Sequence, residues 1–181
     1  MIQILSALVL LQSAPSDVDQ EPDATPSTQA SIPACADEAY SAFDFWVGEW
    51  EVYPAGSDQK AAESRIERVS SGCVIRESWL PLSGADGTSI SLLNAKTNRW
   101  EQIWVGSDGN RVEFAGGPVD GKMILTGFWP GVAGPGQDAL IRMTYTANED
   151  GSVRQFGEAS TDQGITWQTA FDLIYRPKTG E

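Results

Sequence analysis

The sequence predicts an all-β protein, a roughly ten-stranded antiparallel up-and-down barrel preceded by a short helical turn. Apolar or alternating runs of strand length follow one another between residues 45 and 176. Asp-Gly pairs, which are typical of tight hairpin turns, occur at 86–87, 108–109, 120–121 and 150–151. The connections are too short for the crossovers of about a dozen residues that parallel strands need. A barrel is favoured over a sandwich because sequential hairpins that close on themselves leave no exposed edge.

The individual elements follow from the same patterns. Only residues 36–43 read as a helical turn. The strands are expected at residues 45–53, 63–70, 73–82, 88–94, 100–105, 111–115, 122–129, 140–146, 153–160 and 166–176. Prolines and glycines interrupt the alternation at residues 130–139, so this segment is expected to be the one longer connection.

Two segments precede the predicted barrel domain, which covers residues 35–181. Residues 1–14 contain an apolar run that is too short for a bilayer, which takes about 20 residues, and it ends in small residues. This pattern is typical of a signal peptide, although no Lys or Arg precedes the run; the alternative is a buried N-terminal strand. Residues 15–34 contain four prolines and are expected to be a disordered tether. The predicted location is therefore periplasmic or extracellular.

The net charge of −13 is concentrated at the N-terminal end of the chain. Residues 1–59 carry ten acidic residues and no Lys or Arg, whereas residues 60–181 carry fifteen acidic and twelve basic residues. Such a surface is a poor partner for nucleic acid or an anionic membrane. We expect no stable membrane insertion, and the oligomeric state stays open.

The two cysteines, Cys35 and Cys73, are expected to form a disulfide if the protein is exported to an oxidising compartment. In the chain-entropy description, closing a loop of this size stabilises the fold by roughly 4 kcal/mol. The alternative is a pair of buried free thiols.

Three aromatic motifs carry a resemblance to a known family. Residues 43–50 read Phe-Asp-Phe-Trp-Val-Gly-Glu-Trp, residues 72–79 read Gly-Cys-Val-Ile-Arg-Glu-Ser-Trp, and residues 100–105 read Trp-Glu-Gln-Ile-Trp-Val. Together they resemble a bacterial family of exported, uncharacterised lipocalin-like (calycin-type) domains over most of residues 35–176. In lipocalins, the Trp of a Gly-x-Trp triplet closes one end of the barrel beneath an Arg of the last strand. The resemblance thus implies export, a lipocalin-like barrel, and a structural closure made by Gly48, Trp50 and Arg176.

The chain contains no histidine, which restricts its chemistry. A Ser-His-Asp or Cys-His arrangement is excluded, and the commonest zinc ligand and proximal haem ligand is missing. No Gly-rich nucleotide loop is present, and the Asp-Gly turns lack the ligand spacing of a calcium loop. We therefore expect no metal site and no cofactor, and carboxylates remain the plausible acid–base groups.

Strand alternation suggests a binding site inside the barrel. It places Glu77 with Trp79 on one face of the third strand, and Gln102 with Trp104 on one face of the fifth. On the eighth strand, Tyr145 belongs to the apolar face and Arg142 to the opposite one. The candidate ligand-binding residues are Glu77, Trp79, Gln102, Trp104, Arg142 and Tyr145.

If Glu77, Gln102 and Arg142 converge in the lumen, the cavity has aromatic walls and a few polar anchors, as small-molecule sites usually do. Arg142 would then hold Glu77 ionised, and the ligand would be amphipathic. If Arg142 faces solvent, this site does not exist and a packed barrel is favoured. The alternative to a lumen site is that Glu77 and Arg142 are surface residues and that Trp79, Trp100 and Trp104 belong to the core.

These observations favour an exported, non-catalytic barrel that binds a small apolar or amphipathic molecule in its lumen. One alternative is a structural or protein-interaction module with a packed barrel. Another is an enzyme in which Glu77 acts with Tyr145 or Arg142. A lumen of about 300 Å³ or more favours a ligand, whereas filling by side chains favours a module.

Overall fold

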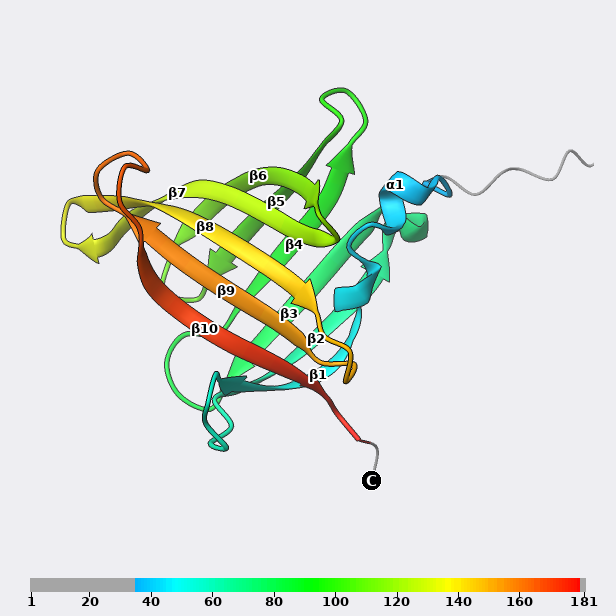
Figure 1. Cartoon of the computed structure of the whole chain (residues 1–181), viewed down its shortest axis with the longest axis horizontal. Coiled ribbons are helices and arrows are strands. Elements are labelled where there is room, and N and C mark those ends of the chain that lie inside the picture. Colours follow the sequence, from blue (N-terminus) through cyan, green and yellow to red (C-terminus); the bar gives the residue numbers. More distant parts are fainter. Residues whose placement is uncertain (1–34, 180–181) are drawn as a thin grey trace, which may run out of the picture. The chain divides into compact units, whose positions relative to one another are not determined.

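The computed structural model describes residues 35–179, which form a closed antiparallel β-barrel (Figure 1). The predicted signal peptide (1–14) and tether (15–34) lie outside the described residues. No helix within this range is long and apolar enough to cross a membrane. The strands are β1 (Gly48–Pro54), β2 (Ala62–Val69), β3 (Val74–Pro81), β4 (Gly87–Asn94), β5 (Arg99–Gly106), β6 (Arg111–Val119), β7 (Lys122–Gly134), β8 (Gln137–Ala147), β9 (Val153–Ser160) and β10 (Gln168–Pro177).

The topology confirms the predicted up-and-down barrel. Each strand pairs with its neighbours in sequence, and β1 pairs with β10 to close the sheet, so that Trp50 lies opposite Pro177. Because successive strands are antiparallel, side chains alternate between the lumen and the outer surface along every strand. The barrel thus has two ends, one near α1 (Glu38–Ser41) and one near the β7–β8 hairpin (Figure 1).

The first strand begins later than predicted. The expected strand at residues 45–53 starts instead at Gly48, because Asp44–Trp46 form a 3-10 turn, η1. The amide of Val47 donates to the carbonyl of Asp44 at 2.9 Å and ends this turn. The N-terminal helical structure therefore consists of α1 followed by η1, and we call residues 38–46 the plug.

Residues 130–139 do not form the predicted long connection. β7 and β8 continue through this segment and are joined by Pro135 and Gly136 alone. The pairing passes from Trp129–Ala139 to Gly134–Gln137, so four residues of β7 bulge opposite Asp138. The bulge tolerates a proline that regular pairing would exclude. Proline and glycine therefore mark a bulge here, not the end of a strand.

The plug closes the barrel end near α1 with aromatic side chains. Phe43 and Trp46 are fully buried, with ring centroids 4.9 Å apart, and both rings contact Tyr145. The indole nitrogen of Trp50 donates to the carbonyl of Trp46 at 3.0 Å. A Cβ atom at Gly48 would lie only 3.1 Å from the Trp50 ring, so a larger residue at this position would crowd the indole.

Arg176 does not cover Trp50, so this part of the implied closure is wrong. The Arg176 guanidinium lies 4.2 Å from the centroid of the Tyr53 ring and 3.6 Å from the carboxylate of Asp58. The reason is alternation: Tyr175 points into the barrel, so the next residue points outward.

A disulfide and the side chain of Arg68 connect the plug region to the β2–β3 hairpin. Cys35 and Cys73 form the predicted disulfide, with Cα atoms 5.2 Å apart. Arg68 donates from Nε to the Asp44 carboxylate at 2.6 Å and also donates to the carbonyls of Tyr40 and Gly72. These contacts join residues far apart in sequence and hold the plug in the barrel end.

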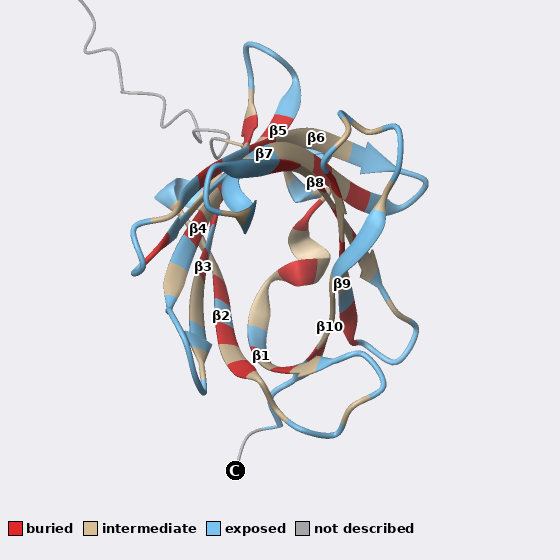
Figure 2. Cartoon of the chain, turned by 90° about the vertical axis from the view of Figure 1, so that its left-hand side faces the viewer, coloured by how far each residue is buried: buried red, intermediate tan, exposed pale blue. Residues whose placement is uncertain are grey.

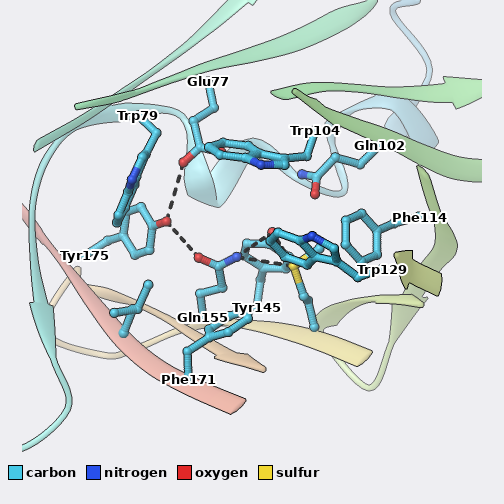
Figure 3. Close-up of a pocket in the computed structure, with 12 residues that line it drawn as sticks. Glu77, Trp79, Gln102, Trp104, Phe114, Trp129, Tyr145, Gln155, Phe171 and Tyr175 are labelled. Atoms are coloured by element: carbon cyan, nitrogen blue, oxygen red, sulfur yellow. Dashed lines mark hydrogen bonds between the residues drawn. The ribbon is translucent and has the colours of Figure 1, made fainter. Parts of the chain in front are cut away.

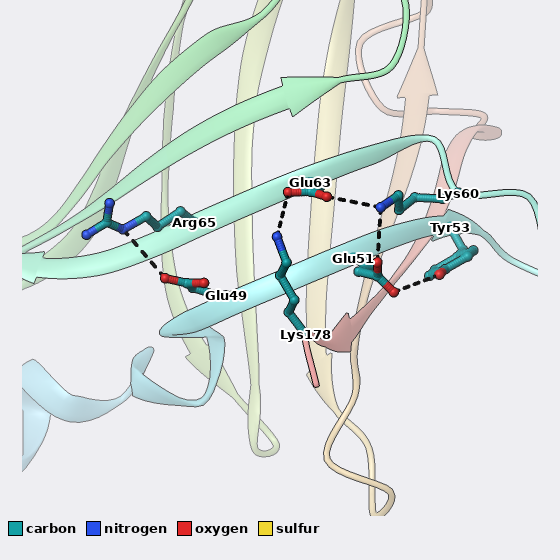
Figure 4. A network of polar contacts seen from close by, with 7 residues as sticks. All are labelled: Glu49, Glu51, Tyr53, Lys60, Glu63, Arg65 and Lys178. Atoms are coloured by element: carbon teal, nitrogen blue, oxygen red, sulfur yellow. Dashed lines mark hydrogen bonds and ion pairs between the residues drawn. The ribbon is translucent and has the colours of Figure 1, made fainter. Parts of the chain in front are cut away.

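On the outer surface, charged side chains bridge the seam where β10 meets β1 (Figure 4). Lys178 donates its amide to the carbonyl of Glu49 at 2.8 Å and its ammonium to Glu63 of β2 at 2.9 Å. Lys60 contacts Glu63 and Glu51 at 3.0 Å each. These exposed ion pairs align the seam, but solvent screening keeps each contribution small.

Candidate functional site

A cavity of about 210 Å³ lies inside the barrel on the side of the plug that faces the β7–β8 end. Figure 2 looks along the barrel from that end, with the partly buried plug at the far side. Five aromatic side chains form most of its wall: Trp79, Trp104, Phe114, Trp129 and Phe171. Five polar side chains also face it: Glu77, Gln102, Tyr145, Gln155 and Tyr175. Met143 and Leu173 complete the lining.

Two of the aromatic rings lie against glycines of neighbouring strands. A Cβ atom at Gly87 would be 2.4 Å from the Trp104 ring, and one at Gly157 would be 2.3 Å from the Phe171 ring. Any larger residue would therefore displace these rings. The glycines allow both rings to rest on the barrel wall, which leaves the lumen between them unfilled.

Glu77 is the central polar residue of the cavity. It lies on β3 and is only 5% exposed. From the two neighbouring strands, the hydroxyls of Ser64 and Ser89 donate to its two carboxylate oxygens at 3.0 and 2.9 Å. From the opposite wall, the hydroxyl of Tyr175 approaches one of these oxygens at 3.4 Å.

Burial raises the pKa of Glu77 from its ordinary value of 4.5 to about 7. The hydrogen bonds from Ser89, Ser64 and Tyr175 act in the opposite direction and offset only part of this effect. A carboxyl group without a neighbouring cation is costly to ionise away from water. Near neutral pH, Glu77 therefore exists in both the protonated and the ionised form.

A chain of hydrogen bonds connects Glu77 to the far wall (Figure 3). Tyr175 donates to the side-chain oxygen of Gln155 at 2.7 Å, and the Gln155 nitrogen donates to the hydroxyl of Tyr145 at 2.9 Å. Burial raises the pKa of both tyrosines, so both keep their protons at neutral pH. Separately, Gln102 donates to Ser91 at 2.9 Å.

Arg142 is the one predicted site residue that lies outside the cavity. The structure brings the other five together, namely Glu77, Trp79, Gln102, Trp104 and Tyr145. Arg142 is on the outer surface, where its guanidinium contacts Glu158 at 2.8 Å and lies 4.1 Å from the Trp167 ring centroid. Ile141 and Met143 point inward, so the residue between them must point outward. The predicted anion–cation pair in the lumen is therefore wrong, and the predicted site of Glu77, Gln102 and Arg142 does not exist. A cavity nevertheless remains beside Glu77 and Gln102, so side chains do not fill the barrel completely.

Several lining residues were not predicted from the sequence, in particular Gln155, Phe171, Leu173 and Tyr175. A usable signal was present on β10. Asp172 pairs with Arg154 on the outer surface at 2.7 Å, and alternation from Asp172 places residues 171, 173 and 175 inside. No local signal shows that Tyr175 meets Glu77, because 98 residues separate them and only barrel closure brings them together.

The arrangement places one titratable carboxyl group beside a largely aromatic cavity wall. Glu77 can accept hydrogen bonds or positive charge when ionised, and it can donate when protonated. Within residues 35–179 there is no group of three Cys, Asp or Glu side chains placed to hold a metal ion. No protein-family model matches the chain, and no curated protein is significantly similar to it. The resemblance to exported lipocalin-like domains therefore stays a prediction.

Proposed function

We propose that the protein binds a small apolar or amphipathic molecule in the lumen of its barrel. The observation that carries this proposal is the unfilled volume of about 210 Å³ between aromatic walls, with the Glu77 carboxyl facing it. A predominantly apolar pocket with a few convergent polar groups is the usual construction of a small-molecule site. A barrel built only for stability would gain by filling this space with apolar side chains.

The volume limits the size of the ligand. It is smaller than the roughly 300 Å³ expected of a site for drug-sized molecules. It is larger than the cavity of about 150 Å³ that holds benzene in an engineered protein. We therefore propose a ligand of about ten non-hydrogen atoms, such as one ring with a short substituent. The small volume and the outward position of Arg142 are the observations that favour the alternative, a structural or protein-interaction module.

An enzymatic function has one observation in its favour. Glu77 faces the cavity with a pKa of about 7, which suits a general acid or base at neutral pH. Tyr145 also lines the cavity and is connected to Glu77 through Gln155 and Tyr175. Arg142 has no part in such a mechanism, because it lies on the outer surface. We rank this function below binding because no second titratable group near neutral pH lines the cavity.

We also propose that the protein works outside the cytoplasm. The Cys35–Cys73 disulfide supports this, because structural disulfides persist mainly in oxidising compartments. The expected mature chain starts near residue 15. N-terminal sequencing of protein from its native host tests this, and recovery of intact Met1 would contradict it.

The binding proposal is tested by narrowing the lumen without touching its polar groups. Gly157→Ala places a methyl group where the Phe171 ring now lies, so the ring is pushed into the cavity. Gly117→Ala is the matched control, because its Cβ atom would meet nothing within 4 Å. A panel of single-ring compounds of differing polarity is titrated into each protein, and tryptophan fluorescence and thermal unfolding are recorded.

We expect wild type and Gly117→Ala to bind the same compounds, and Gly157→Ala to bind them at least about tenfold more weakly. Native mass spectrometry of protein purified from its source adds an unbiased search for a bound molecule. If no compound binds and the native protein shows only the mass of the bare chain, the lumen is not a binding site. The packed-module alternative then replaces the proposal.

A further inference from the structure

The lumen contains an acid without a basic partner. Glu77 is the only charged side chain among the residues that line the cavity. All twelve Lys and Arg residues of the chain lie within the described range, and none of them is buried or lines the cavity. Within residues 35–179, no Lys or Arg side chain therefore serves as a counter-ion for Glu77 when it is ionised.

The hydroxyls around Glu77 support the ionised form but bring no charge. Ser64 and Ser89 each direct a hydroxyl to one carboxylate oxygen, and such donors favour the anion. Tyr175 gives little further support, because it lies 3.4 Å from Glu77 and its proton is shared with Gln155 at 2.7 Å. The carboxylate is therefore oriented toward the cavity but only partly compensated.

Indole rings flank this carboxylate. Trp79 follows Glu77 by two residues on β3 and points to the same side, while Trp104 on β5 pairs with Ser89, the strand neighbour of Glu77. Figure 3 shows the Glu77 carboxyl between these two side chains at the cavity wall. The faces of indole rings attract cations, most strongly where water is excluded. One carboxylate and two indoles thus favour positive charge at the same place.

We propose that the ligand is a small organic monocation, an amine or a quaternary ammonium compound, whose charged nitrogen lies beside Glu77, Trp79 and Trp104. Its apolar part lies against Phe171, Leu173 and Trp129. This inference rests on the proposed function and adds the chemical class of the ligand. An anion of the same size is repelled by Glu77, and a neutral molecule lacks the attraction to the carboxylate.

Binding of a cation is coupled to the release of a proton from Glu77. The groups that face Glu77 are Ser64 from β2, Ser89 from β4 and Tyr175 from β10, and Tyr145 is connected to Tyr175 through Gln155. The pKa values of both tyrosines are raised, so Glu77 alone titrates here near neutral pH. With its pKa at about 7, its ionised fraction rises from about 0.1 at pH 6 to about 0.9 at pH 8. The affinity for a cation should therefore rise about tenfold over this interval.

The test uses three probes of nearly equal size that differ in charge: benzylamine, benzyl alcohol and benzoate. Isothermal titration calorimetry at pH 8 compares their affinities for the full chain. We expect benzylamine to bind at least about tenfold more tightly than benzyl alcohol, and benzoate to bind most weakly. Glu77→Gln keeps the size of the side chain and should remove the preference for benzylamine. Glu113→Gln, a change at an exposed residue paired with Arg111, should keep it.

A second measurement needs no variant, so it remains decisive if Glu77→Gln fails to fold. Calorimetry of wild type and benzylamine near pH 6.5, in two buffers of different ionisation enthalpy, should detect the release of a fraction of a proton. Equal or tighter binding of benzyl alcohol or benzoate would overturn the cation inference but leave lumen binding intact. Failure of all three probes to bind would also overturn the cation inference. The compound panel with Gly157→Ala then tests lumen binding separately.

Discussion

At the scale of single residues, the ionisation of Glu77 depends on neighbours from three other strands. Alternation along β3 determines that the side chain enters the barrel, whereas Ser64, Ser89 and Tyr175 determine how the carboxyl is solvated there. Hydrogen bonds from their hydroxyls compensate only part of the solvation that the ionised carboxyl loses on burial. The pKa of Glu77 is therefore raised, and folding and protonation are coupled at this residue.

We predict that stability falls as Glu77 ionises. The folded-state pKa of about 7 lies above the ordinary 4.5, so the folded protein holds this proton more tightly. Stability from this group is complete below pH 4.5 and is lost as the pH rises through 7. Each pKa unit corresponds to about 1.4 kcal/mol, so Glu77→Gln should gain about 2–3 kcal/mol relative to wild type between pH 5 and pH 8.

Urea denaturation of both proteins at these two pH values measures this difference. The chain has no histidine whose titration would complicate this interval. A difference between the two proteins that does not change with pH would show that Glu77 is solvated in the folded state.

A second residue-scale prediction separates the two parts of the implied closure. Trp50→Ala removes a nearly buried indole that contacts the plug, and it should cost about 3–5 kcal/mol of unfolding free energy. Arg176→Ala removes an exposed contact with Tyr53 and should cost less than about 1 kcal/mol. Chemical denaturation at constant pH compares them. Equal costs would argue against the outward position of Arg176.

At the scale of elements, the plug and the β2–β3 hairpin form one unit. α1 has only four residues, no side-chain cap and no buried residue, so it has little stability of its own. Its position depends on the disulfide, on the contact between Arg68 and Asp44, and on the burial of Phe43 and Trp46. The position of the plug at the barrel end therefore depends on tertiary contacts and not on the stability of α1 itself.

We predict that the disulfide contributes substantially to this arrangement. Cys35 and Cys73 are separated by 38 residues, and closing such a loop should stabilise the fold by roughly 4 kcal/mol. Denaturation of the Cys35→Ser, Cys73→Ser double variant against wild type measures the loss. Thiol titration of the unfolded, unreduced wild type should find no free sulfhydryl, and two free thiols would refute the bridge.

At the scale of the whole molecule, the two ends of the barrel differ. The fully and nearly buried tryptophans, Trp46, Trp50 and Trp100, gather at the plug. Trp79, Trp104 and Trp129 are partly exposed and line the cavity on the other side. One end is therefore sealed by core packing, while the interior can be reached from the other.

This asymmetry predicts two classes of tryptophan fluorescence. Acrylamide should quench the partly exposed indoles, including Trp167 on the outer surface, and should leave the emission of the three buried ones largely unaffected. A lumen ligand should protect Trp79, Trp104 and Trp129 but not Trp167. A single class with uniform quenching would contradict the sealed end. The Trp167→Phe variant provides the control by removing the outer indole.

Local pattern was sufficient for much of the fold and for part of the site. Asp-Gly turns and alternation located the strands and their sequential pairing, and alternation placed Glu77 with Trp79 and Gln102 with Trp104 on one face each. These properties depend on residues near each other in sequence. The same alternation, applied strictly, places Arg142 and Arg176 outside. Arg142 was expected to pair with Glu77, and Arg176 to cover Trp50. Neither expectation agrees with the two-residue period of the strand on which the arginine lies.

The sequence by itself therefore determined the fold class and the sequential order of the strands. Only the tertiary structure decided which side chains meet in the lumen. Tyr175 reaches Glu77 because β10 returns to pair with β1, and the cavity stays open because Gly87 and Gly157 receive the Trp104 and Phe171 rings. The charge in the lumen also became clear only from the assembled cavity, because its complete lining contains Glu77 and no Lys or Arg.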